Sequence, residues 1–202
     1  SNDPDLYHFC KQNNIPIFKN LSAHLSDLVS IDFDYLFSFD NQITLARDLF
    51  RLCKGRFINC HYGPLPSSAG FHSCYWAIMQ QSQQYQITWH TMTSQKQTGH
   101  IIQRMDIPVD PLETTGSLIA KCHKCALITF RLLLRELKSI AALKEVEHSY
   151  HIDYKPKVIN IPYHGFIHWS AHAKAIIQQF RALQFSPFNN PLTTLKICIN
   201  QS

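Results

Sequence analysis

Charged side chains are scarce in this sequence of 202 residues: Asp, Glu, Lys and Arg make up 16%, whereas hydrophobic residues make up 45%. That balance excludes a disordered chain and a coiled coil, since both need many charged residues. The net charge of +5 is spread along the chain and forms no basic tract, so we expect no nucleic-acid partner. The composition predicts a folded unit with a substantial core.

The sequence also lacks long apolar runs, and its cysteines are not spaced as in disulfide-rich proteins. The most apolar stretch, residues 125–137, contains Arg131 and Arg135, so it cannot be a membrane span of about 20 apolar residues. The seven cysteines are odd in number, and no signal-peptide pattern opens the chain. We expect a cytoplasmic protein with reduced thiols. Cys122 and Cys125 lack a second ligand pair, so core cysteines are favoured over a metal site.

Strand and helix patterns alternate in the first part of the chain. Strand-like runs at 33–40 and 55–61 are each followed by a helical pattern, at 43–53 and 72–81. This alternation predicts an α/β fold with a mostly parallel sheet flanked by helices. Ligands of such sheets bind at the carboxyl ends of the strands.

From residue 85 onward the pattern changes to a hairpin and two further helices. Alternating runs at 85–93 and 100–109 flank a turn-like segment and predict an antiparallel hairpin beside the sheet. Apolar stripes predict helices over 114–138 and 171–183. We expect residues 1–145 to form the main domain. Residues 146–202 should form a connector and a closing helix that packs on the same domain.

The strand at 55–61 ends on a polar pair, Asn59 and His61. Their spacing places both side chains on the same face of a strand. An imidazole can shuttle a proton and a carboxamide can donate to an oxyanion, so the pair fits acyl transfer. Taken alone, such a pair is more often an ordinary hydrogen-bonded strand end.

The motifs after this pair resemble those of the formyltransferases that use 10-formyltetrahydrofolate. In that family an Asn-x-His motif precedes a Leu-Leu-Pro loop with a glycine, a Trp-Ala-Ile helix and a Thr-x-His strand that leads to an Asp-Thr-Gly turn. This sequence has matching residues in the same order: Asn59, His61, Pro64-Leu65-Pro66, Gly70, Trp76-Ala77-Ile78, Thr88-Trp89-His90 and Thr98-Gly99. Segments 117–122 and 180–197 extend the resemblance over nearly the whole chain. It is strongest to formylation domains of nonribosomal peptide and polyketide synthetases, which are related to methionyl-tRNA and sugar N-formyltransferases.

The resemblance implies a Rossmann-like formyltransferase fold, 10-formyltetrahydrofolate as donor, and a small-molecule or carrier-bound amine as acceptor. It assigns Asn59 to the oxyanion and His61 to the oxyanion and the moving proton, and it places Gln97 where the family has its third catalytic residue. A strand end and a loop would line the donor pocket: Ser38, Phe39, Asn41, Pro64, Leu65, Pro66 and Gly70.

The sequence departs from the family at three points. Gln97 replaces an aspartate, and a neutral amide neither stabilises an imidazolium nor accepts a proton, so catalysis should be impaired. Residues 67–69 are Ser-Ser-Ala where the family usually has an aromatic residue and an arginine, which should alter the grip on folate or substrate. The catalytic domain of the family opens with a strand, a helix and a second strand. Residues 1–145 match that domain only from the point after these three elements. A partner chain or an oligomer could cover the missing part of the sheet.

Two other functions stay open. A non-catalytic module could keep the fold and bind a folate-like ligand or a protein partner. A hydrolase using His61 on a formyl or acyl group would also depend on the replaced carboxylate. His90 and His100 flank the turn that holds Gln97, and either could supply part of the missing base or simply pack in the structure.

Overall fold

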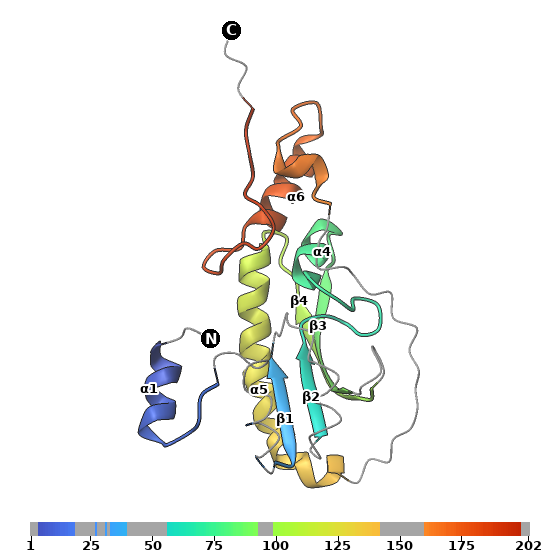
Figure 1. The fold of residues 1–202 in the computed structure, drawn as a ribbon. Coiled ribbons are helices and arrows are strands. Elements are labelled where there is room, and N and C mark those ends of the chain that lie inside the picture. The colour runs from blue at the N-terminus through green and yellow to red at the C-terminus, as the bar shows by residue number, and fades with distance from the viewer. Residues whose placement is uncertain are drawn as a thin grey trace.

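The computed structural model describes residues 4–18, 27, 31, 33–39, 56–92, 99–141 and 160–198. The elements follow one another along the chain as drawn in Figure 1: α1 (Pro4–Gln12), β1 (Tyr35–Phe39), β2 (Arg56–His61), α4 (Ser73–Met79), β3 (Gln84–Met92), β4 (Ile101–Pro108), α5 (Thr115–Ala141), the 3₁₀ turn η1 (Pro162–Gly165) and α6 (Ala173–Leu183). The helix predicted at 43–53 lies outside the described residues.

The four described strands form one mixed sheet in the order β1-β2-β3-β4. β1 runs parallel to β2, whereas β2 with β3 and β3 with β4 are antiparallel. The predicted α/β class and the antiparallel hairpin are confirmed. The mostly parallel sheet is not seen among the described strands. The reason is that the short helix α4 lies beyond the carboxyl end of β2, and the chain enters β3 from there in the opposite direction (Figure 1).

One face of the sheet packs against α5. Trp89 of β3 donates from Nε1 to Thr129 Oγ1 of α5 at 2.8 Å and stacks on Phe130 with ring centroids 5.7 Å apart. Apolar residues from the sheet and from α5 complete this core: Ile58, Cys60, Ile87, Ile107, Leu118, Cys122, Ala126 and Leu133. Each fully buried Ile or Leu contributes roughly 1.5–3 kcal/mol by leaving water. The core therefore fixes which sheet face is left for polar residues.

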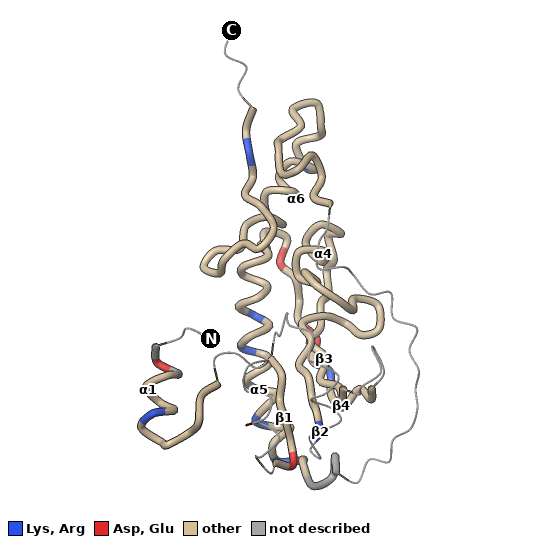
Figure 2. Tube along the Cα trace, viewed as in Figure 1, with Lys and Arg blue, Asp and Glu red and all other residues tan. Residues whose placement is uncertain are grey.

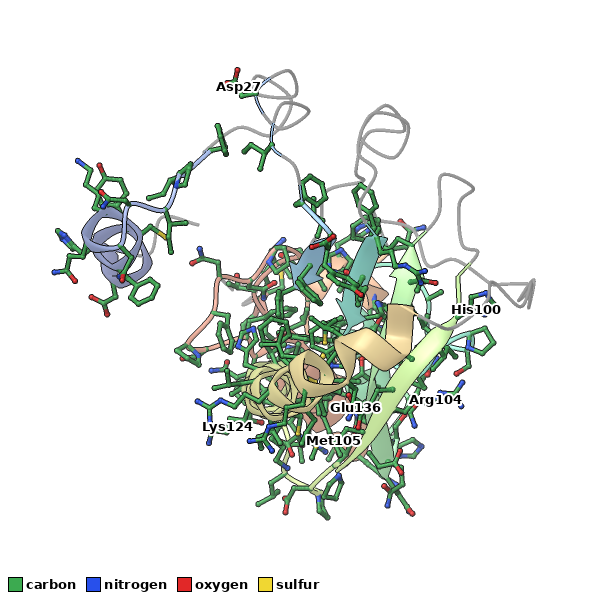
Figure 3. All side chains as sticks on the ribbon, turned by 90° about the horizontal axis from the view of Figure 1, so that it is seen from below. Asp27, His100, Arg104, Met105, Lys124 and Glu136 are labelled. Carbon is green, nitrogen blue, oxygen red and sulfur yellow. The ribbon has the colours of Figure 1, made fainter. Side chains whose placement is uncertain are left out.

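The opposite sheet face carries polar side chains. Figure 3 shows Met105 of β4 pointing toward α5 and its neighbour Arg104 pointing away from it. The same alternation holds in β2, where Ile58 and Cys60 on the α5 side are buried and Asn59 and His61 on the other side are half-buried. Phe57 shares the face of Asn59 and is a buried apolar exception there. Figure 2 shows the described Lys and Arg residues distributed over several elements instead of collected on one.

Cys122 and Cys125 take different places on α5. Cys122 is fully buried, and its pKa is raised by a hydrogen bond to Cys74 and by burial, so it is a neutral thiol of the core. Cys125 is half-buried. The described residues contain no cluster of three His, Cys, Asp or Glu suited to a metal ion. None of the described helices is long and apolar enough to cross a membrane.

The first turn of α5 lies directly against the chain that leaves α6. Gly116 N donates to Gln184 O at 2.9 Å, and Thr115 Oγ1 donates to Ala182 O at 2.7 Å. A Cβ on Gly116 would lie only 2.2 Å from Ser186 O. Only glycine permits this approach, so the residue couples the start of α5 to the end of α6.

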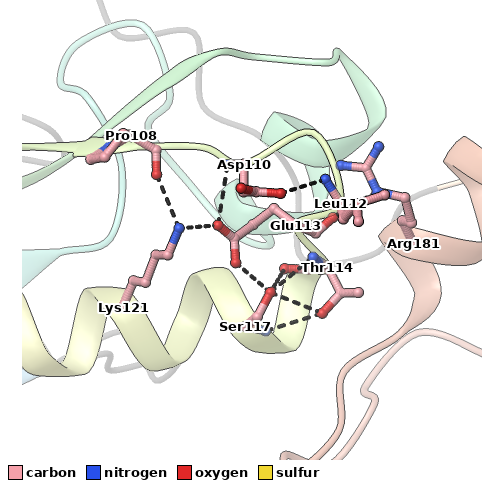
Figure 4. A network of polar contacts seen from close by, with 8 residues as sticks. All are labelled: Pro108, Asp110, Leu112, Glu113, Thr114, Ser117, Lys121 and Arg181. Carbon is pink, nitrogen blue, oxygen red and sulfur yellow. Dashed lines mark hydrogen bonds and ion pairs between the residues drawn. The ribbon is translucent and has the colours of Figure 1, made fainter.

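A buried carboxylate holds this junction to β4 (Figure 4). Glu113, whose side chain is 4% exposed, accepts hydrogen bonds from Ser117 Oγ and from Lys121 Nζ, with which it forms an ion pair, and from Asp110 N at 3.3 Å. Lys121 also donates to the last carbonyl of β4, and Arg181 of α6 donates from Nε to Glu113 O at 2.8 Å. Burial raises the pKa of Glu113, but the bonds from Lys121, Ser117 and Asp110 outweigh it and leave the pKa below its usual value.

Replacing Glu113 by glutamine is expected to lower the free energy of unfolding by about 1–3 kcal/mol at neutral pH, since hydrogen bonds to a charged group are lost. A carboxyl group whose pKa is lower in the folded than in the unfolded protein stabilises the fold at pH values above its unfolded-state pKa. It loses this effect as the pH falls through its folded-state pKa. The stability difference between wild type and Glu113→Gln should therefore shrink below the ordinary glutamate pKa of 4.5. Urea unfolding across pH measures it, and a constant difference would contradict this role of the charge.

Candidate active site

Asn59 and His61 lie at the carboxyl end of β2, on the sheet face away from α5. In the strand register Asn59 stands opposite Ser38 of β1 and His90 of β3, while His61 stands opposite Thr88. Ser38, Asn59 and His90 thus form a row across three strands on one face. The shared face predicted for Asn59 and His61 is confirmed by this register.

Asn59 is hydrogen-bonded to His90. Its Nδ2 lies 3.1 Å from His90 Nε2, and His90 Nδ1 lies 2.9 Å from Thr91 O. A carbonyl oxygen only accepts, so His90 Nδ1 carries the proton and the neutral ring has its lone pair on Nε2. Asn59 is therefore the donor. Its amide carries a second N–H, for which the described residues provide no partner.

His61 is held by the loop that follows β2. Its Nε2 lies 2.7 Å from Ser68 O, which also accepts from Ser73 Oγ at 2.9 Å. The same acceptor argument places the ring proton on Nε2 and the lone pair on Nδ1. Gly63 makes room for this ring, because a Cβ there would lie 2.8 Å from His61 Nε2.

Both imidazoles are neutral at neutral pH. Burial lowers the pKa of His61, although the bond to the Ser68 carbonyl acts in the other direction. Burial and the nearby His61 lower the pKa of His90 to about 4, against a raising effect of the Thr91 carbonyl. Each ring therefore offers one donor and one acceptor in a fixed arrangement.

The loop from Pro64 to Gly70 is tied to the hairpin strands. Thr88 Oγ1 donates to Gly63 O at 2.8 Å and accepts from Leu65 N at 3.4 Å. Arg104 Nη2 donates to Leu65 O at 3.1 Å. Thr88 belongs to the Thr-x-His motif, so the sequence offered a signal for it, but no sequence pattern marked Arg104. These two side chains hold the loop over His61.

The residues predicted at the end of β1 separate onto two faces. The Ser38 side chain lies on the Asn59 face; the residue is 6% exposed, and its Oγ has no hydrogen-bond partner among the described residues. Phe39 lies on the α5 face, with its ring 5.2 Å from Trp89 and 5.0 Å from Phe130. The side chain of Phe39 is therefore not brought together with Asn59. Asn41, also predicted for the donor pocket, lies outside the described residues.

No carboxylate joins this site among the described residues. Asp106 accepts a hydrogen bond from Gln86 at 2.8 Å, and Glu113 belongs to the junction at α5. Gln97, which the resemblance places at the family aspartate, lies outside the described residues and stays a prediction. The described part of the site consists of neutral donors and acceptors: one carboxamide, two imidazoles and a buried hydroxyl.

Comparison with known proteins identifies the fold. No family model matches the chain. A methionyl-tRNA formyltransferase from Clostridioides difficile (strain 630) is 24% identical over 187 residues, which covers 91% of this chain and 59% of that protein. The chain thus spans about three fifths of the length of this curated relative.

Two solved structures are similar to the chain over most of its length. A 4-N formyltransferase from Francisella tularensis superposes with a TM-score of 0.71 at 18% identity, covering 92% of this chain and 75% of that one. The N-formyltransferase from Helicobacter canadensis, solved with folinic acid and dTDP-3-aminofucose, gives a TM-score of 0.67 at 19% identity, covering 87% and 62%. The predicted resemblance to formyltransferases and the Rossmann-like formyltransferase fold are confirmed.

Proposed function

We propose that this chain, which has the formyltransferase fold, transfers a formyl group from 10-formyltetrahydrofolate to a substrate amine, at a rate limited by Gln97. The proposal rests on one observation, the placement of Asn59 and His61 at the end of β2. The carboxamide has a second N–H to donate, and the imidazole carries its lone pair on Nδ1. Those are the two groups that acyl transfer to an amine requires.

The chemistry follows from these groups. The amine nitrogen attacks the formyl carbon and a C–N bond forms, while the carbonyl oxygen becomes an oxyanion that the second N–H of Asn59 stabilises. Nδ1 of His61 takes the proton that the amine loses. Collapse of the tetrahedral species breaks the bond between the formyl carbon and N10 of the folate, and N10 takes the proton. The products are a formamide and tetrahydrofolate.

Ser38 supports a polar donor beside Asn59. Its hydroxyl is buried and unpartnered among the described residues, and such a group costs about 1–3 kcal/mol unless a ligand satisfies it. The resemblance that assigned Ser38 to the donor pocket also assigned Pro64, Leu65, Pro66 and Gly70, whose loop lies beside His61. The Helicobacter canadensis relative was solved with folinic acid, which supports a folate-type donor by similarity.

The acceptor is proposed as a class only. We propose a small-molecule or carrier-bound amine, and the similarity to an enzyme solved with dTDP-3-aminofucose favours amino sugars for the first tests. Acceptors bound to the carrier domains of synthetases stay in the panel because of the sequence resemblance to their formylation domains.

The second candidate is a non-catalytic module that binds a folate-like ligand or a protein partner. It is favoured by the neutral character of the site, in which no described carboxylate contacts Asn59, His61 or His90. Among the described residues, the Ser68 carbonyl is the group hydrogen-bonded to His61 that would stabilise an imidazolium formed during transfer.

Incubation of the full chain with 10-formyltetrahydrofolate and a panel of amino sugars and aminoacyl carriers is expected to release tetrahydrofolate and to yield formylated amine. A reaction without amine separates transfer from hydrolysis of the donor. Thermal stabilisation by the folate without any turnover would favour the binding module instead. Neither turnover nor stabilisation would contradict both candidates.

A further inference from the structure

The imidazole of His90 stands between Asn59 and the backbone of its own strand. It accepts from Asn59 through Nε2 at 3.1 Å and donates through Nδ1 to Thr91 O at 2.9 Å. We propose that His90 is a positioning residue, which anchors the Asn59 amide nitrogen so that its second N–H has one fixed direction toward the reacting carbonyl. This inference rests on the proposed function of Asn59.

The hydrogen bond matters because a carboxamide has two nearly equivalent orientations. A flip by 180° exchanges its oxygen and nitrogen, so an unrestrained Asn59 would present an acceptor in half of its states where a donor is needed. The Nε2 lone pair of His90 accepts from the amide nitrogen and repels the amide oxygen. It therefore selects one orientation before substrate binds, and such preorganisation is the main source of oxyanion stabilisation.

The position of His90 is itself fixed by the backbone of the hairpin. The register between β3 and β4 shifts between Trp89 and His90, so that Trp89 pairs with Gln103 and His90 with Ile101. Bulges of this kind re-aim side chains beside functional sites. Thr91 just after the bulge exchanges two bonds with His100, its N donating to His100 O at 2.8 Å and its Oγ1 accepting from His100 N at 2.7 Å.

The charge state of the ring agrees with this role. A protonated ring would present a donor to the Asn59 amide nitrogen, and two donors would face each other. With its pKa lowered to about 4, His90 keeps its lone pair on Nε2 at neutral pH. His90 therefore acts through Asn59 and is not proposed as a base.

Two substitutions separate the two hydrogen bonds of the ring. His90→Asn keeps a donor near the position of Nδ1 but removes the acceptor for Asn59. His90→Gln places an amide oxygen near the position of Nε2 and keeps that acceptor. We expect His90→Asn to lower kcat for formyl transfer about tenfold with little change in the KM of the donor, and His90→Gln to stay within about threefold of wild type.

A spectroscopic measurement tests the contact without turnover. In ¹⁵N-labelled full-length protein, scalar coupling across the hydrogen bond should join Asn59 Nδ2 to His90 Nε2 and should vanish in His90→Asn. Absence of this coupling in wild type overturns the inference, as does a wild-type kcat in His90→Asn or an equal loss in both variants. If the coupling is present but wild type transfers no formyl group to any amine, the proposed function fails while the orientation of Asn59 stands.

Discussion

Replacing Gln97 by aspartate is expected to raise kcat for formyl transfer by about a hundredfold or more. The resemblance places Gln97 where the family has a carboxylate, and the described site contains none in contact with His61. A carboxylate stabilises the imidazolium that forms when His61 takes a proton, and it can accept that proton onward. In a serine-protease triad, exchanging the aspartate for asparagine costs about 10⁴ in turnover. The reverse exchange should recover a sizeable part of such a factor.

Gln97→Asn is the matched control for this substitution, because asparagine has the shape of aspartate without the charge. Steady-state release of tetrahydrofolate should accelerate in Gln97→Asp and should stay at the wild-type rate in Gln97→Asn. Equal increases in kcat in both variants would mean that the shorter side chain, and not the negative charge, causes the effect. If Gln97→Asp gains nothing, the non-catalytic module becomes the better description of the chain.

The same substitution should also change the titration of His61. Burial lowers its pKa in the wild-type site, and a nearby carboxylate favours the charged form and raises it. The imidazole resonances of His61 should therefore titrate at higher pH in Gln97→Asp than in wild type. An unshifted titration would mean that residue 97 does not face His61, whatever its effect on the rate.

The polar pair could be predicted from sequence because it depends on local periodicity. Asn59 and His61 are two residues apart on one strand, so alternation alone puts them on one face, and the motif order around them identified the formyltransferase fold. The strand at 33–40 was predicted from a compact run of aromatic and aliphatic residues, and the structure has β1 at Tyr35–Phe39 within it. Local patterns of this kind are fixed by neighbours along the chain and need no tertiary information.

The contacts that organise the site could not be predicted because they join residues far apart in sequence. The bond from Asn59 to His90 spans 31 positions and depends on a strand register with a bulge. Arg104 reaches Leu65 across 39 positions. Whether β2 and its neighbours run parallel or antiparallel likewise depends on how the chain turns after β2, and the hydrophobic pattern does not encode this turn. The error at Phe39 has a different origin: alternation along β1 already places this side chain on the face opposite to Ser38, where it contacts Trp89 and Phe130.

Replacing Asn59 by alanine is expected to lower kcat for formyl transfer by about 10²–10³, the usual loss when one oxyanion donor is removed. The donor acts only on charge that develops in the transition state, so kcat and kcat/KM should fall together while the KM of the folate changes little. The loss is best measured in the Gln97→Asp background, because the higher starting rate there allows a large decrease in kcat to be measured. Gln86→Ala is the control, because this amide lies on the same sheet face but bonds to Asp106.

A double substitution decides how Asn59 and His90 share this effect. If His90 acts only by orienting Asn59, then His90→Asn should cost nothing further once Asn59 is alanine, and the two losses should be strongly non-additive. Additive losses would mean that each side chain contacts the reacting groups separately. Thermal unfolding of all four proteins keeps the comparison free of stability effects, since Asn59→Ala also leaves His90 Nε2 without its donor. A loss confined to kcat in proteins of equal stability would place the oxyanion contact at the carboxyl end of β2.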